Sequence, residues 1–190
     1  MNISYIISAI IGATFLTSIV LLSISMNRSS YETTYSLLTN NHVDHLQQTI
    51  SYDMRYVGFG SNNEILVMND STFHFRAEVN GNVRDFLWSA STNTNTGTSN
   101  PNVYRVERVG PDYDSSSGTS TLTFDASNFR FFYYNDGHGN QITVDPDEVR
   151  SVRVEVTIQS SEAIGRNSDG SGRHSVSNWN RLFRPISLNL

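Results

Sequence analysis

Cysteine is absent from the 190 residues of the chain. Its absence excludes disulfide bonds, thiolate zinc sites, iron–sulfur clusters and a cysteine nucleophile. Lysine is absent as well, so that all 13 basic residues are arginines, and the net charge is −5. An acidic balance argues against a nucleic-acid-binding surface, and we expect no nucleic acid among the partners. Because disulfides are excluded, the folded part of the chain must be held by packing and hydrogen bonds alone.

Catalytic motifs are missing too. The sequence has no G-x-S-x-G, no H-E-x-x-H, no phosphate-binding glycine loop and no strand-linked G-x-G-x-x-G. His74, His138 and His174 are scattered over strand and loop sequence, with no nucleophile visible beside them. We therefore expect a protein that is not an enzyme.

Two kinds of residue could hold a metal ion. His42 and His45 stand three residues apart, but a closed site needs further ligands, and we expect both on the solvated face of a helix. The oxygen-rich stretches Asp145–Glu148 and Asn167–Gly172 leave calcium as an alternative, although neither completes the twelve-residue calcium loop. Because Asp and Asn also favour turns, we expect turns at both places and no bound cofactor.

The longest apolar run extends from Ile3 to Ile24 without a charged residue. As a helix it would measure about 33 Å, enough to cross the hydrocarbon core of a bilayer. No basic residue precedes it and no small-residue cleavage site follows it, which argues against a cleaved signal peptide. We expect a retained membrane helix. Its orientation is weakly specified, because Arg28 is the one flanking charge and, taken alone, would place the large domain inside.

Small residues recur within this apolar run. Ser4, Ser8 and Gly12 follow one another every four residues, and Thr14 and Ser18 form a second pair with the same spacing. Small side chains at this spacing line a helix face and let another helix approach closely. The pattern predicts helix–helix assembly. The alternative is a single-pass anchor in which these residues have no role in packing.

The helical pattern continues beyond the apolar run. Between Asn27 and Gly58 there is no proline and no internal glycine. Apolar residues recur there mostly every three or four positions, which is helical periodicity. We expect Leu38, Leu46, Ile50 and Val57 to pack this part of the helix on a sheet. Gly58 and Gly60 are expected to end a helix of some 50 residues.

Beyond Ser61 the hydrophobic period changes to two, which is typical of strands. The dipeptide Asn80-Gly81 predicts a tight hairpin, and a second hairpin is expected to join "FRFFYY" to "QITV". Long polar stretches rich in Gly, Ser, Thr and Asn predict three loops. The predicted strand segments read "EILVM", "STFHFRAEV", "VRDFLW", "VYRVERV", "STLTF", "NFRFFYYN", "QITV", "VRSVRVEVTI" and the closing "LFRPISLNL".

These patterns predict an α+β protein in three parts. Residues 1–26 form an apolar helix for a membrane or a filament core, and residues 27–60 are its amphipathic continuation. Residues 61–190 form a predominantly antiparallel β domain laid on that continuation. About 160 residues follow Met26, enough for a single hydrophobic core.

An apolar and then amphipathic helix followed by an antiparallel β domain resembles the type IV pilins and pseudopilins, and most closely their minor-pilin class. The residues that carry the likeness are "LQQTISYDMRYVGFG" at the helix end and the later strand "VRSVRVEVTI". Precursors in that family carry a short basic leader, and the mature helix has Glu at its fifth position. Here Tyr5 stands fifth and the first acidic residue is Glu32. Either this chain is already mature, or it is a divergent relative that keeps its N-terminus.

The resemblance implies a structural subunit of a bacterial, extracellular, pilus-like filament, with the helices bundled inside and the β domains outside. Its partners would be further copies of the chain, an inner-membrane assembly machinery, and membrane lipid before assembly. Two alternatives stay open. One is a minor pilin or pseudopilin that initiates or caps such a filament in a secretion or uptake machine, and the other is a membrane-anchored binding domain that never polymerises.

Overall fold

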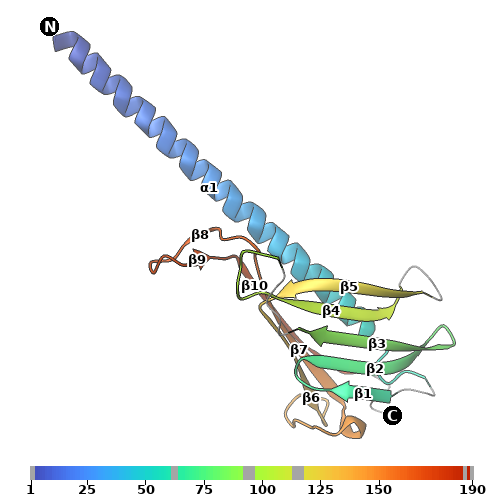
Figure 1. The fold of residues 1–190 in the computed structure, drawn as a ribbon. Helices are drawn as coiled ribbons and strands as arrows, with labels where there is room; N and C mark the ends of the chain where they lie inside the picture. The colour runs from blue at the N-terminus through green and yellow to red at the C-terminus, as the bar shows by residue number, and fades with distance from the viewer. Residues whose placement is uncertain (1–2, 61–63, 92–96, 113–117, 186–187, 189–190) are drawn as a thin grey trace.

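The protein consists of one long helix that projects from a two-sheet β domain (Figure 1). The structure is a computed structural model and describes residues 3–60, 64–91, 97–112, 118–185 and 188. A helix packed on antiparallel sheets belongs to the α+β class, and that prediction is confirmed. Residues 186–187 and 189–190 of the predicted closing segment, and parts of two predicted loops, lie outside the described residues.

The helix α1 is continuous from Ile3 to Asp53, or 51 residues, which corresponds to about 76 Å. It ends five residues earlier than the expected stop at Gly58. At Asp53 the bonding pattern tightens: the Tyr56 N–H donates to the Asp53 carbonyl, three residues back. Gly58 follows with a φ of 77°, a left-handed conformation that glycine adopts without strain. The glycine therefore turns the chain after a short irregular segment and does not cap the helix itself.

A five-stranded antiparallel meander follows the helix in the order β1-β2-β3-β4-β5. A second antiparallel sheet has the order β10-β7-β6, and β8 pairs with β9 in a small separate hairpin. The strand bounds are β1 Glu64–Met68, β2 Thr72–Val79, β3 Asn82–Ala90, β4 Tyr104–Pro111, β5 Thr119–Ala126, β6 Asn128–Tyr134, β7 Ser151–Gln159, β8 Gly165–Arg166, β9 Gly172–Arg173 and β10 Val176–Phe183. A short 3-10 helix, η1, spans Pro146–Glu148.

The predicted hairpins have different outcomes. Asn80 and Gly81 join β2 to β3 with φ values of 52° and 76°, as the primed hairpin turn requires. "QITV" does not form a strand: Ile142 makes only an isolated bridge to Tyr134, and that part of the prediction is wrong. Asp136 accepts hydrogen bonds from the backbone N–H groups of residues 139–141 and so closes the turn. The returning chain then bonds to the end of β6, through the Asn135 N–H to the Gln141 carbonyl and the Thr143 N–H to the Tyr133 carbonyl, without extending into a strand.

The closing strand also differs from the prediction. It begins at Val176, six residues before the predicted "LFRPISLNL", and pairs along its length with β7. The residues before it, expected to be a loop, contain the β8–β9 hairpin. Strand β10 is rich in Asn and Ser, so its sequence lacks the apolar alternation by which strands are recognised.

The core lies between the two sheets and the end of α1. Aromatic side chains meet across the sheets, with ring centroids 5.5 Å apart for Phe73 and Phe131 and 5.9 Å apart for Trp88 and Phe129. The C-terminal part of α1 lies against β7 and β10. Its buried apolar residues, together with those of the turn that follows, are Val43, Leu46, Ile50, Met54 and Val57.

The residues expected to pack the helix on a sheet thus divide into two groups. Leu46, Ile50 and Val57 are fully buried in the core, where the sequence places them. Leu38 is 47% exposed, and its expected packing is wrong. The domain covers the helix from Thr39 onward on the face that Thr39 and Val43 share, four residues apart, and Leu38 lies outside that face.

We expect Leu46→Ala to lower the free energy of unfolding by about 2–5 kcal/mol, because it removes a fully buried side chain and leaves a cavity. The test is urea unfolding of the fragment 27–190, which we expect to fold as a monomer, followed by tryptophan fluorescence. Leu38→Ala is the matched control and should cost less than about 0.5 kcal/mol. Similar costs for the two leucines would contradict the packing described here.

A buried ion pair also connects the helix to the five-stranded sheet. The Asp53 carboxylate receives two hydrogen bonds from the Arg108 guanidinium, at 2.9 and 3.0 Å, and a third from the Trp88 indole N–H at 2.8 Å. All three side chains are fully buried. Arg108 donates in addition to the Pro111 carbonyl and the Ser120 hydroxyl. Two parallel hydrogen bonds between a guanidinium and a carboxylate define the relative position of the two groups. The pair therefore fixes the end of the helix against β3 and β4.

Candidate assembly surface

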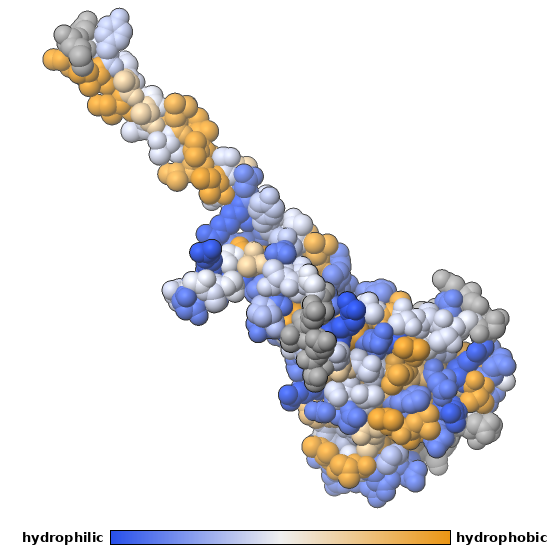
Figure 2. All heavy atoms as spheres, in the orientation of Figure 1, coloured by the Kyte–Doolittle hydropathy of each residue, from blue (hydrophilic) through white to orange (hydrophobic). Residues whose placement is uncertain are grey.

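The N-terminal half of α1 presents apolar side chains to the surroundings. Every residue from Ile3 to Tyr31 is exposed, and this stretch contains the whole uncharged apolar run Ile3–Ile24. Figure 2 shows these side chains as a hydrophobic shaft that extends beyond the more polar globular part. Exposed apolar patches of this size mark sites for membrane or protein partners. By length and composition the helix is able to cross a membrane.

The small residues of the shaft share one broad side of it. At about 100° per residue, Ser8 and Gly12 stand about 40° and 80° from Ser4 in one direction around the helix. Ser18 and Thr14 stand about 40° and 80° from Ser4 in the other direction. The small residues therefore cover one side of the shaft over an arc of about 160°.

Gly12, Thr14 and Ser18 present neither a bulky side chain nor an unsatisfied hydroxyl to an approaching helix. A methyl group built on Gly12 would meet nothing within 4 Å. The hydroxyls of Thr14 and Ser18 donate to the carbonyls of Ile11 and Thr14 in their own helix, at 2.9 Å each. Their polar groups are thus already satisfied, which allows them to lie in lipid or against an apolar neighbour without an unpaired hydrogen-bonding group.

The β8–β9 hairpin is attached to α1 just beyond the apolar shaft. The Glu32 carboxylate accepts a hydrogen bond from Arg173 of the hairpin at 2.6 Å and another from Arg28 one turn earlier at 3.2 Å. All three side chains are partly exposed, so solvent screens these pairs. They position the hairpin without contributing much stability. No sequence pattern predicts this contact, because it joins residues 141 positions apart.

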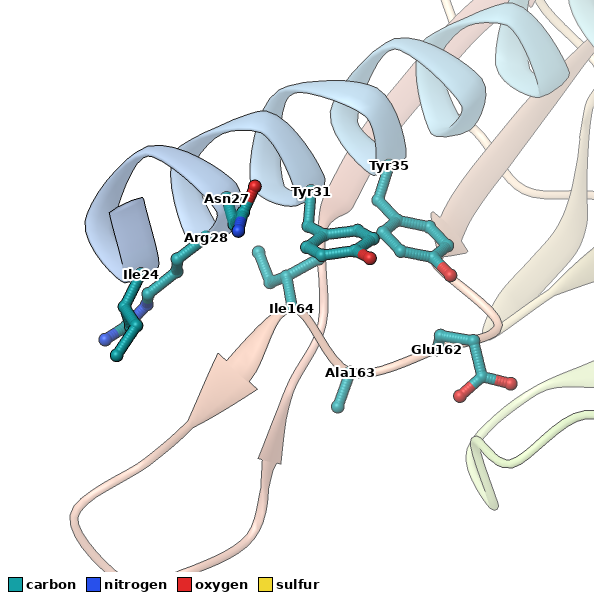
Figure 3. Close-up of a pocket in the computed structure, with 8 residues that line it drawn as sticks. All are labelled: Ile24, Asn27, Arg28, Tyr31, Tyr35, Glu162, Ala163 and Ile164. Atoms are coloured by element: carbon teal, nitrogen blue, oxygen red, sulfur yellow. The ribbon is translucent and has the colours of Figure 1, made fainter. Parts of the chain in front are cut away.

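Two neighbouring hollows lie between the helix and the base of this hairpin. The first, of about 590 Å³, is lined by Ile24, Asn27, Arg28, Tyr31, Tyr35 and residues 162–164. Figure 3 shows the rings of Tyr31 and Tyr35 projecting from the helix toward this segment, with Ile164 beneath Tyr31. The second hollow, of about 730 Å³, shares Arg28 and adds Arg166 and the hairpin glycines. Both lie where the apolar shaft ends.

The candidate metal ligands are placed as follows. His42 and His45 are exposed on α1, and the ring of His45 lies 5.5 Å from that of Phe124. Asp145 caps η1 by accepting the Asp147 N–H. Hydrogen bonds from the Ser171 hydroxyl and N–H hold the pKa of Asp169 below its usual value. Within the described residues, no three His, Asp or Glu side chains come together as a metal would require.

Comparisons of the chain with protein-family models, with curated proteins and with solved structures give no match.

Proposed function

We propose that this protein is the structural subunit of an extracellular, pilus-like filament of the type IV pilin kind. The N-terminal helices bundle along the filament axis, and the β domains coat the outside. Before assembly, the apolar shaft holds each subunit in the membrane. The partners are then further copies of the same chain and the inner-membrane machinery that extracts them. No catalytic step is part of the proposal.

One observation carries the proposal. The exposed apolar shaft and the buried end of α1 belong to a single unbroken helix, and that end is fixed in the β domain by Leu46, Ile50 and the Asp53–Arg108 pair. Each subunit therefore holds its domain at one fixed direction relative to its shaft. A regular filament requires this of every copy, because the core and the coat must follow the same symmetry. A solitary membrane anchor does not require it.

The arrangement of small residues supports the same proposal. In a filament core each helix is surrounded by several others, and small side chains let neighbouring helices approach closely. The broad side that carries Ser4, Gly12 and Ser18 is suited to such an approach. A non-polymerising anchor in lipid does not need it.

The intact mass of the surface-assembled protein tests the proposal. We expect a mass that includes the segment 1–26, allowing for modification at the N-terminus, because this segment supplies the filament core. A mature N-terminus near Asn27 would remove the shaft and end the filament proposal. The measurement is mass spectrometry of protein sheared from the cell surface, with the membrane fraction of the same cells as the reference.

A further inference from the structure

We propose that the two hollows at the base of the shaft bind the headgroup of an anionic phospholipid while the subunit is in the membrane. This inference rests on the membrane-anchored precursor in the proposed function, and adds a specific lipid contact to it. The site consists of the helix turn around Arg28 and the β8–β9 hairpin with Arg166.

The position of the hollows points to the headgroup layer. Ile24 is the last residue of the apolar run and also lines the first hollow, together with Tyr31 and Tyr35 one and two turns beyond Arg28. In a membrane-spanning helix, the residues directly after the apolar run lie among headgroups, where tyrosine and arginine are enriched. The hollows therefore open at the depth of the lipid phosphates and need no rearrangement to reach them.

The chemistry of the lining suits a phosphate. Arg28 gives only its Nε–H to Glu32, which leaves the rest of its guanidinium for a second acceptor. The place where a side chain on Gly165 would begin is 3.3 Å from Arg28 Nη2, so the glycine leaves that side of the guanidinium uncovered. Arg166 is exposed on the same hollow. Arginine binds phosphate oxygens through paired N–H groups, and anionic surfaces attract it further.

The nearby carboxylates are already engaged. Glu32 accepts from both Arg28 and Arg173, Glu162 accepts from the Ser99 hydroxyl at 2.8 Å, and Asp169 accepts from Ser171 within the hairpin turn. None of these contacts uses Arg166. Arg166, together with the guanidinium N–H groups of Arg28 that Glu32 does not use, is therefore the cationic part of the hollow that faces a ligand, while Arg173 holds the hairpin in place.

Native mass spectrometry of the full-length chain in detergent, titrated with phosphatidylglycerol or phosphatidylcholine, tests the proposal. We expect one retained phosphatidylglycerol, held in preference to phosphatidylcholine. Arg28→Gln and Arg166→Gln should each weaken its retention about fivefold, as expected for one arginine at an anionic surface. Arg84→Gln on the β2–β3 hairpin is the control and should leave lipid retention unchanged. All variants should keep their fold, as circular dichroism would show.

Three results would overturn the lipid site: equal retention of the two lipids, no effect of the double variant Arg28→Gln/Arg166→Gln, or an equal loss with Arg84→Gln. The binding is measured on detergent-solubilised subunits, so it does not depend on polymerisation. Failure of the lipid site and failure of the filament proposal can therefore be told apart.

Discussion

Cells that carry Gly12→Leu are expected to make few or no filaments while they keep a normal amount of the protein in the membrane. Leucine preserves the hydrophobicity of the shaft, so insertion should be unaffected. Its side chain would project from a position that now has open space around it, and would keep a neighbouring helix from approaching closely. The measurements are electron microscopy of sheared surface material and immunoblotting of membranes.

The control for this variant is Ile11→Leu, which replaces the residue before Gly12 by a side chain of the same size and hydrophobicity. It should leave filaments at normal number and length. The β domain should keep its fold in both variants, because residue 12 lies in the exposed part of α1, far from the buried positions that begin at Thr39. Normal fibres from Gly12→Leu cells would show that this helix side is not a packing seam. The single-pass anchor would then become the better interpretation.

Asp53→Ala is expected to lower the free energy of unfolding by about 3–5 kcal/mol. The variant leaves the Arg108 guanidinium buried without its counter-charge and removes the acceptor of the Trp88 indole N–H. Domains of ordinary stability have about 5–15 kcal/mol in total, so the loss would be a large part of the whole. Urea unfolding of the fragment 27–190, followed by tryptophan fluorescence, measures it.

Two further variants distinguish the effect of losing the ion pair from a general effect of substitution on the fold. Glu107→Ala changes an exposed carboxylate beside Arg108 and should alter the free energy of unfolding by less than about 0.5 kcal/mol. The double variant Asp53→Leu/Arg108→Met replaces both charges by apolar groups and should recover most of the loss, since no unpaired charge remains. A cost below about 1 kcal/mol for Asp53→Ala would contradict a role for the pair in fixing the helix end.

The sequence predicted the parts of the fold that have a regular apolar period. The helix and most strands follow from their periods, and the buried positions Leu46 and Ile50 follow from the helical stripe. Strand β10 was largely missed because its apolar residues do not alternate regularly: Val176 is exposed, Ser177 is half-buried, and Leu182 and Phe183 are adjacent. The predicted end of α1 was five residues too far along the chain, because glycine commonly follows the last residue of a helix and Gly58 is the first glycine after Asn27. The helix already ends at Asp53.

The buried ion pair shows what a single sequence leaves undetermined. Asp53 falls on the buried stripe three residues after Ile50, and Arg108 shares the inward face of β4 with Val106 by the period of two. Each position therefore carried a signal of burial. That they would meet was not predictable, because they stand 55 residues apart and their pairing depends on how the sheet lies on the helix. The same holds for Arg173 and Glu32 at the hairpin.

The central claim is that this chain polymerises through its apolar shaft. The most direct measurement is electron microscopy of sheared cell-surface material, with labelling by an antibody against the β domain and mass spectrometry of the purified fibres. The account predicts thin fibres that are labelled along their whole length, with this chain as their bulk protein. Absence of the chain from surface fibres, with all of it in the membrane as single copies, would contradict the account.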